Sequence, residues 1–186
     1  ITHIVQQTLG FYREASSPVP VKVSHLLDNV LQLYSRRLGL RGVRVEKTYE
    51  FDKDIEVFPG EMRQVFSNLV ANAIEALPPG GRVRLHLYPS RNWHTLEEGI
   101  RVVVADNGPG ISPENRRQIF EPFFTTKGER GTGLGLWVSR GIVQKHGGRL
   151  TMRSTTRHGC SGTVFSVFLP CAREKRLRAT SSETAA

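Results

Sequence analysis

The sequence predicts a two-layer α/β sandwich with a mixed, mostly antiparallel sheet and helices on one face. Segments of alternating apolar and polar residues, typical of half-buried strands, are interleaved with segments that carry apolar residues at helical spacing. Several of the strands follow one another as hairpins do, which favours a sandwich of one sheet and one helical layer. A chain of 186 residues with 38% apolar content is long enough for one main domain with a buried core.

The N-terminal part of the chain, up to residue 77, contains three predicted helices and one strand. Residues 1–14 place apolar side chains along one stripe, as the end of a packed helix does, and "ASSPVP" (15–20) reads as a linker. Ser24 is a candidate cap for a helix that carries Leu26, Leu27, Val30, Leu31 and Leu38 at helical spacing. "VRVEKTY" (43–49) alternates like a strand, and after a loop a strong helix over 60–77 ends at "PPGG".

The rest of the chain alternates strands with short helices. Strands are predicted at 83–88 and 100–105, and the polar loop "SRNWHTLEEG" joins them. A glycine turn, a short helix near 113–119 and an irregular stretch lead to a helix that reaches about His146, in which Leu134, Val138 and Ile142 have the spacing of a buried face. Strands at 149–155 and 162–170 close the domain as a hairpin.

Composition limits the classes of function without choosing one. The net charge of +9 favours anionic partners, but part of it lies in "REKRLR" (173–178), within a tail (171–186) that we expect to be solvated. Cys160 and Cys171, with His158, fall short of a zinc site, so both cysteines are expected to be reduced. The longest apolar run is "VVVA" (102–105) and no basic-then-apolar leader is visible, so we expect a soluble, cytoplasmic domain, with membrane segments only outside this chain.

Two asparagines mark the helix at 60–77. Asn68 and Asn72 stand four residues apart, so both amides project from one face. Neither residue favours a helix interior, and the surrounding side chains supply the core face: Val65, Phe66, Leu69, Val70, Ala73 and Ile74. The asparagines are therefore either ligand-binding groups at the border of the core or ordinary solvent-facing residues.

A second candidate is the turn "ADNGPGI" (105–111), which follows the predicted strand directly. Asp106 at a strand end can accept a hydrogen bond from an exocyclic amine, and Gly108 and Gly110 let a flat ring approach the backbone. The alternative is an Asp-Asn-Gly hairpin turn, which needs no ligand.

The third candidate is "GERGTGLG" (128–135), where glycines crowd the first turn of the last helix. Each glycine inside a helix costs roughly 1 kcal/mol against alanine, so Gly131, Gly133 and Gly135 need a compensating role. Exposed N–H groups at a helix start bind phosphate, and glycines let the backbone wrap an anion. Neither a Walker loop nor a dinucleotide fingerprint fits, because Leu follows the last glycine and the spacing is G-x-G-x-G.

Together, "NLVANAIEA", "DNGPGI", "EPFFTTK" and "GTGLGL" resemble, in order and separation, the N, G1, F and G2 boxes of sensor histidine kinases. The resemblance covers roughly residues 21–170 and implies the Bergerat-type ATP-binding fold shared with gyrase, MutL and the ninety-kilodalton heat-shock chaperones. It also implies that Asp106 meets the adenine amino group, that Asn72 ligates Mg²⁺ with Asn68 beside it near the phosphates, and that residues 121–130 form a mobile ATP lid. Further nucleotide contacts are then expected from Gly108, Gly110, Gly131, Thr132, Gly133, Leu134, Gly135 and Thr163.

The sequence also departs from that family pattern. Many kinases of the family carry Lys or Arg three residues after the metal-ligating Asn, where this chain has Glu75, so Lys127 is the proposed substitute for the missing phosphate contact. A phosphoacceptor box, with His followed by Glu or Asp and then Pro, does not occur, and His3 is followed by "IVQQ". By resemblance, residues 1–14 match the end of a second dimerisation helix.

Three functions remain to be weighed. The resemblance implies a histidine kinase domain that transfers the γ-phosphate of ATP to a His on a dimerisation helix absent from this chain, with a response regulator receiver domain as partner, a homodimer in the full-length protein and no nucleic acid. An ATPase clamp of the gyrase or chaperone type would carry a Glu as general base where this chain has Asn68, which cannot take a proton. A non-catalytic nucleotide-binding module is the third reading.

Overall fold

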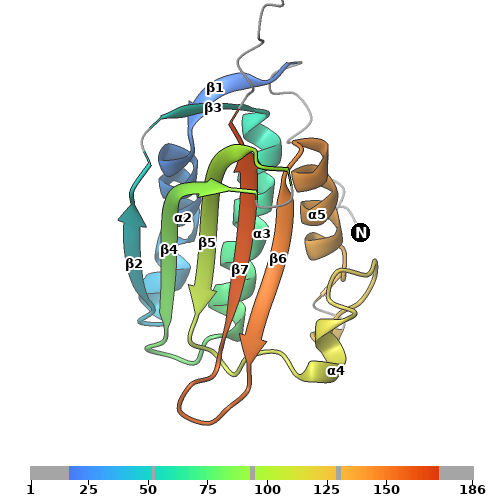
Figure 1. The fold of residues 1–186 in the computed structure, drawn as a ribbon. Helices are drawn as coiled ribbons and strands as arrows, with labels where there is room; N and C mark the ends of the chain where they lie inside the picture. Colours follow the sequence, from blue (N-terminus) through green and yellow to red (C-terminus); the bar gives the residue numbers. More distant parts are fainter. Residues whose placement is uncertain (1–16, 52, 93–94, 129–130, 172–186) are drawn as a thin grey trace, which may run out of the picture.

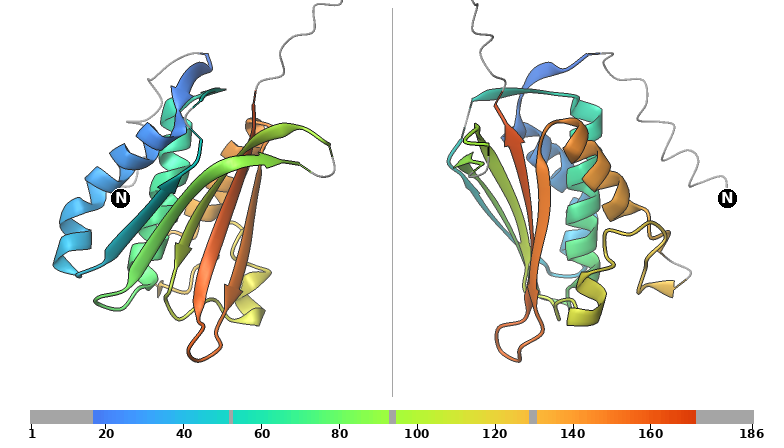
Figure 2. Two further views of the ribbon diagram at one scale, coloured as in Figure 1. Left: turned by 60° about the vertical axis from the view of Figure 1, so that its left-hand side comes forward. Right: turned by 45° about the vertical axis from the view of Figure 1, so that its right-hand side comes forward.

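The computed structural model of the protein describes residues 17–51, 53–92, 95–128 and 131–171, and it confirms the two-layer α/β sandwich (Figure 1). One layer is a five-stranded sheet in the order β2-β4-β5-β7-β6, with bounds Arg44–Tyr49, Arg82–Arg91, Glu98–Asp106, Gly162–Pro170 and Arg149–Thr155. The other layer consists of α2 (Val23–Leu40), α3 (Pro59–Ala76) and α5 (Gly135–Lys145). All three helices lie on the same side of the sheet (Figure 2).

The sheet is mixed and mostly antiparallel, as predicted. The pairs β4–β5, β5–β7 and β6–β7 are antiparallel, whereas β2 and β4 are parallel, with Arg44 opposite Arg82. The parallel pair has a simple cause, because the chain passes through α3 between β2 and β4, and such a crossover returns the second strand in the same direction.

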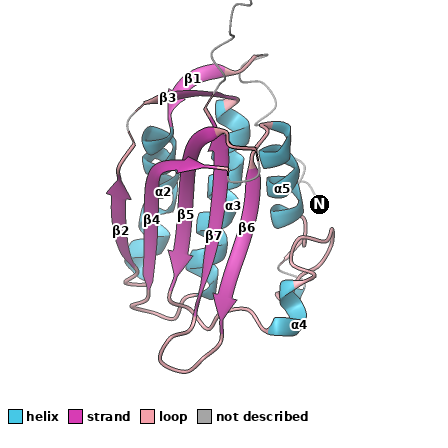
Figure 3. Cartoon of the chain, in the orientation of Figure 1, coloured by secondary structure: helices cyan, strands magenta, loops and turns pink. Residues whose placement is uncertain are grey.

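A second, two-stranded sheet corrects the prediction for the N-terminal part. Val19–Lys22 form β1, which pairs antiparallel with β3 (Asp54–Val57), so the last two residues of the expected linker belong to a strand (Figure 3). Strand β3 lies in a stretch that was predicted as a loop. A four-residue strand with only Ile55 and Val57 buried is too short to give a periodic signal, and Pro20 is tolerated because it lies in this short edge pair.

Helix α2 begins differently from the prediction and ends against the next helix. Its cap position is Lys22, and among the described residues no side chain caps this end, while Ser24 is buried inside the first turn. At its C-terminal end the guanidinium of Arg41 donates to the carbonyl oxygens of Ile74 and Leu77, each at 2.6 Å. These bonds satisfy carbonyls at the end of α3 and fix that end against α2.

The core lies between α3 and the sheet. All six residues predicted for the core face of α3 are buried, and they belong to one core with the buried side chains of β4 and β5: Val83, Leu85, Leu87, Ile100, Val102 and Val104. Helix α3 is thereby held rigidly along its length, so the polar groups at the border of its buried face have defined positions.

The buried face of α5 is not the one predicted. Ser139 and Val143 are buried, whereas Leu134, Val138 and Ile142 are only half-buried. Val138 and Ile142 line an open groove with Phe120 and Trp137. The pattern of apolar residues thus predicted the helix correctly, but of the predicted face only Ile142 packs against the core, and it is half-buried.

Other expectations lie outside the described residues, namely the helix at 1–14 and nearly all of the basic tail (171–186), of which Cys171 alone is described. Both cysteines are free, with Cys160 exposed. Within the described ranges no helix is long and apolar enough to cross a membrane.

Candidate functional site

The predicted site residues come together at one end of the sandwich. They lie on the C-terminal half of α3, at the end of β5, in the stretch between α4 (Pro113–Arg116) and α5, and in the first turn of α5 (Figure 1). We use the term lid for residues 121–128 of that stretch. These segments are up to about 70 residues apart in the chain, so their proximity is a product of the fold.

Asn68 is held by α5. Its amide Nδ2 donates to the carbonyl oxygen of Gly135 and to Oγ of Ser139, each at 3.1 Å. Both donor hydrogens therefore face α5, and Oδ1 is left to accept from a group outside that helix. The alternative of an ordinary solvent-facing asparagine is wrong for this residue.

Ser139 was missed by the sequence prediction. Its side chain is fully buried, and a buried hydroxyl is expected to have a hydrogen-bond partner. The available signal was a single serine inside the apolar run "LWVSRGIV", but the run does not say which distant residue it would meet.

Asn72 is in contact with the lid. The ammonium Nζ of Lys127 donates to Oδ1 of Asn72 at 2.8 Å and to Oε2 of Glu75 at 2.6 Å. Glu75 also accepts from Arg37 of α2 at 3.1 Å. Burial alone would raise the pKa of Glu75, but the hydrogen bond and charge of Lys127, together with those of Arg37, lower it. Glu75 is thus an ionised bridge between two cations.

The turn after β5 is not a hairpin. Strand β5 pairs with β4 and β7, and the chain after Asp106 runs on to α4, so the Asp-Asn-Gly hairpin alternative is wrong. Oδ1 of Asp106 accepts the N–H of Gly108 at 2.9 Å. Burial raises the pKa of Asp106, and the amides of Gly108 and Thr163 only partly oppose this effect. The result is a half-buried carboxylate with acceptor capacity left over, which suits an amine donor.

The surroundings of Gly108 and Gly110 explain differently why each position carries glycine. Gly110 has φ +78°, and a Cβ there would lie 2.1 Å from the carbonyl oxygen of Thr155, so the close contact with β6 requires glycine. Gly108 is close to Asp106 Oδ1 and to the carbonyl oxygen of Ala76, at 2.9 and 3.1 Å from the Cβ position. For Gly110, packing within the protein is therefore a sufficient reason for glycine.

The glycine loop before α5 packs against the lid. Gly133 has φ +66°, and a Cβ there would lie 2.3 Å from the carbonyl carbon of Phe123, whose own φ is also +66°. A positive φ at an exposed phenylalanine is strained, and such strain persists only where the surroundings impose it. Gly131 would similarly meet Thr125, whereas Gly135 has only ordinary contacts with Asn68. The amide of Leu134 donates to Oγ1 of Thr132 at 3.4 Å.

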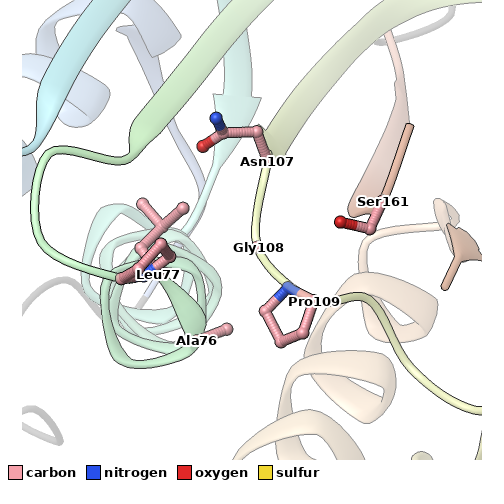
Figure 4. Close-up of a pocket in the computed structure, with 7 residues that line it drawn as sticks. Ala76, Leu77, Asn107, Gly108, Pro109 and Ser161 are labelled. Atoms are coloured by element: carbon pink, nitrogen blue, oxygen red, sulfur yellow. The ribbon is translucent and has the colours of Figure 1, made fainter. Parts of the chain in front are cut away.

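A hollow of about 460 Å³ opens beside the Asp106 turn (Figure 4). Its described lining is Ala76, Leu77, Pro78, Asn107, Gly108, Pro109 and Ser161. It reaches the C-terminal end of α3 and Gly108, but within the described residues its lining includes neither asparagine of α3.

The chemistry of the site suits a hard cation held mainly by phosphates. Among the described residues no group of three His, Cys, Asp or Glu side chains could hold a metal by itself. The oxygen of Asn72 nevertheless has a cation at bonding distance, the ammonium of Lys127. A single amide oxygen with phosphates and water is a suitable ligand set for Mg²⁺, which sheds its hydration shell reluctantly.

This fold and this site define a class of protein, the nucleotide-binding domains of the Bergerat type. Residues 59–173, more than half of the chain, match the family described as "Histidine kinase-, DNA gyrase B-, and HSP90-like ATPase", and the chain belongs to that family. The predicted recognition as an ATP-binding catalytic domain of the sensor histidine kinase type is confirmed by the relatives and solved structures that follow.

Three curated relatives illustrate the similarity. Sporulation kinase A of Bacillus subtilis is 34% identical over 151 residues, which is 81% of this chain and 23% of the relative. The signal transduction histidine-protein kinase/phosphatase MprB of Mycolicibacterium smegmatis is 37% identical over 167 residues, 84% of this chain and 31% of the relative. The sensor histidine kinase ZraS of Salmonella typhimurium is 33% identical over 172 residues, which is 91% of this chain and 35% of the relative. The chain thus spans about a quarter to a third of the length of these relatives.

Solved structures agree in fold. The mycobacterial sensor histidine kinase MprB superposes with a TM-score of 0.72 at 30% identity, covering 83% of this chain and 97% of the other. Histidine kinase ThkA in complex with response regulator protein TrrA gives a TM-score of 0.70 at 28% identity, covering 94% of this chain and 48% of the other.

Proposed function

We propose that this domain binds ATP with Mg²⁺ and transfers the γ-phosphate to a histidine on a dimerisation helix that is not part of this chain. The observation that carries this proposal is the state of Asn68. Ser139 and Gly135 take both of its donor hydrogens, so its oxygen remains to accept a hydrogen bond. An amide has no basic group, so Asn68 cannot remove a proton from water. An ATPase clamp needs a carboxylate as general base there, so phosphoryl transfer to a stronger nucleophile is favoured over hydrolysis.

Each side of the site has a part in that reaction. Asp106 accepts from the adenine amino group, with Gly108, Gly110 and Thr163 beside the base. Asn72 would hold Mg²⁺ beside the phosphates, and the ion would supply positive charge to neutralise them. The backbone of the glycine loop and the first turn of α5 (131–135) contact the phosphates, where the N-terminus of the helix favours negative charge.

Lys127 is the lid residue that supplies positive charge to the phosphates. It lies close to Asn72 and therefore within reach of any phosphate bound to the same ion. This arrangement supports Lys127 as the substitute for the basic residue that many kinases carry in place of Glu75.

The partners follow from the same proposal. The phosphorylated histidine would pass its phosphate to a response regulator receiver domain, and one structural neighbour, histidine kinase ThkA, forms a complex with a response regulator protein. We further propose a cytoplasmic location, dimerisation through helices outside this domain, membrane attachment only through segments outside this chain, and no nucleic-acid partner.

Incubation with γ-labelled ATP tests the proposal. The chain alone should bind ATP in calorimetry, release phosphate very slowly and retain no acid-labile label. A separately supplied dimerisation domain with its phosphoacceptor histidine should become labelled. Rapid phosphate release, by contrast, would favour the ATPase reading, and binding without transfer under any condition would favour a non-catalytic module.

A further inference from the structure

His146 is a buried titratable residue that the proposed reaction does not use. Its side chain is 5% exposed and lies where the C-terminal end of α5 meets the N-terminal end of α3, at the opposite end of the sandwich from the Asp106 turn (Figure 1). Nε2 accepts the backbone N–H of Phe58 at 3.1 Å, and Nδ1 is 2.8 Å from the carbonyl oxygen of Ile142. A carbonyl oxygen can only accept, so Nδ1 carries the hydrogen and the geometry fits the neutral imidazole.

This one imidazole caps two helices. Phe58 is the N-cap residue of α3, and Ile142 carries one of the last carbonyl oxygens of α5. The acceptor nitrogen faces the positive end of the α3 dipole and the donor nitrogen faces the negative end of the α5 dipole, so both helix ends favour this arrangement. Helix α5 is thus joined to α3 at this end by the imidazole and at its other end by Asn68, which donates to Gly135 and Ser139.

A carboxylate beside the ring offers a second partner. Glu61 is the third residue of α3, a position where glutamate commonly accepts the N–H of the N-cap residue, but here the imidazole accepts that hydrogen. Oε1 of Glu61 accepts from Lys145, and Oε2 lies 3.8 Å from Nδ1 of His146. Within the described residues Oε2 is a buried atom without a hydrogen-bond partner, so it is available to a charged imidazolium.

Protonation would change the contacts of this ring. A hydrogen on Nε2 would point at the N–H of Phe58, donor against donor, so the bond between the two helices would be lost. The charged groups that the described structure records around the ring act in opposite senses, because the carboxylate of Glu61 favours the imidazolium and the ammonium of Lys145 disfavours it. Lys145 also lies 4.4 Å from the ring centre of Phe58, which meets the imidazole edge-on at 5.6 Å.

We propose that His146 is a positioning residue for the phosphate side of the site: the neutral ring sets the place of α5 on α3, and its protonation loosens α5 and weakens nucleotide binding. The connection runs along one short helix, because Ser139, which holds the amide of Asn68, lies about two helical turns before His146. Nucleotide as the ligand rests on the proposed function, whereas the coupling between the ring and Asn68 does not.

Nuclear magnetic resonance tests that coupling without nucleotide. Between about pH 8 and pH 5, where histidine ordinarily changes charge, the wild-type His146 ring, the Phe58 amide and the side-chain amide of Asn68 should titrate with one midpoint. In His146→Gln neither amide should titrate in this range, because the glutamine oxygen can accept from Phe58 but gains no proton. A ring that takes up no proton there, or an Asn68 amide that stays constant while the Phe58 amide titrates, would overturn the proposal.

Two further variants keep the test decisive. His86→Gln is the matched control, because His86 contacts Glu50 at 2.8 Å on the face of β4 away from the helices, so its loss should leave the Asn68 titration in place. Glu61→Gln removes the carboxylate that favours the imidazolium, so the Asn68 titration should move to lower pH even if His146→Gln does not fold. A midpoint that stays or rises in Glu61→Gln would overturn the role of Glu61.

Calorimetry with ATP tests the consequence for binding. The ratio of wild-type to His146→Gln affinity cancels the titration of Asp106 and of ATP itself, so it isolates His146. This ratio should be close to one near pH 8 and about two- to tenfold lower near pH 5, the factor expected for loss of one hydrogen bond. A ratio that does not change with pH would contradict the proposal. If neither protein binds ATP, the proposed function fails, while the resonance experiment still decides the coupling.

Discussion

Replacing Asp106 by Asn should separate nucleotide recognition from folding. In the structure Oδ1 of Asp106 accepts the amide of Gly108, and the amide of Thr163 also donates to the carboxylate. An asparagine has one acceptor oxygen, which these backbone amides would use, and its NH₂ group would then face the adenine amine, donor against donor. The loss of a charge-assisted acceptor costs roughly 1.5–3 kcal/mol, which is roughly a 10- to 150-fold weaker affinity for ATP.

The comparison that isolates this effect is a purine nucleotide without the exocyclic amine. Asp106→Asn should weaken that nucleotide far less than it weakens ATP, since no amine is present to lose its partner. Calorimetry with both ligands gives the two ratios. Equal losses for the two nucleotides would refute the adenine-reading role of Asp106.

The raised pKa of Asp106 predicts the direction of two further effects, on thermal stability and on the pH dependence of ATP affinity. Burial raises the pKa of Asp106 above the usual 3.8, so the folded domain favours the protonated carboxyl. The free energy of unfolding therefore falls as the pH rises from the pKa of the unfolded chain through the pKa of the folded domain. At neutral pH Asp106→Asn should therefore be at least as stable as wild type in thermal melts, and a less stable variant would contradict this argument. In wild type, ATP affinity should fall on acidification with a midpoint above 3.8, because the ionised carboxylate is a charge-assisted acceptor for the amine, whereas the protonated carboxyl is neutral and carries a donor hydrogen.

Three further substitutions test the remaining parts of the site. Asn72→Ala should abolish the gain in ATP affinity from Mg²⁺, and a full gain in calorimetry would exclude Asn72 as the metal ligand. Ser139→Ala removes one of the two partners that orient Asn68 and should weaken ATP by about 2- to 10-fold, whereas Ser67→Ala, which breaks a bond from α3 to α2, should leave affinity unchanged. Gly133→Ala places a Cβ 2.3 Å from backbone at a positive φ, so it should disorder the lid in hydrogen exchange and weaken ATP, and a variant with wild-type exchange would show that the loop adapts.

Local patterns determined most of the architecture. The alternation in β4, β5, β6 and β7 and the apolar spacing in α3 each have enough residues to be read without neighbours, and all of them were predicted close to their observed bounds. The asparagine motif of α3 and the two glycine-rich motifs were also readable, because each needs a special backbone or side chain at a fixed spacing.

Short or edge elements depended on the rest of the fold. Strand β3 has two buried residues, and it exists because β1 pairs with it across more than 30 residues of sequence. The degree of burial along α5 likewise depends on where the helix crosses the sheet, so the half-buried Val138 and Ile142 could not be distinguished from fully buried residues by spacing alone.

Partner choice within the site was decided only by the tertiary structure. The sequence shows Glu75 as a departure and Lys127 as a candidate cation, yet their contact joins positions 52 residues apart and depends on the path of the lid. The orientation of Asn68 likewise depends on Ser139, 71 residues away. Hydrogen bonds have short range and strict geometry, so residue types and local spacing can name the groups of this site, while the packing of α3 against α5 and the lid decides which of them meet.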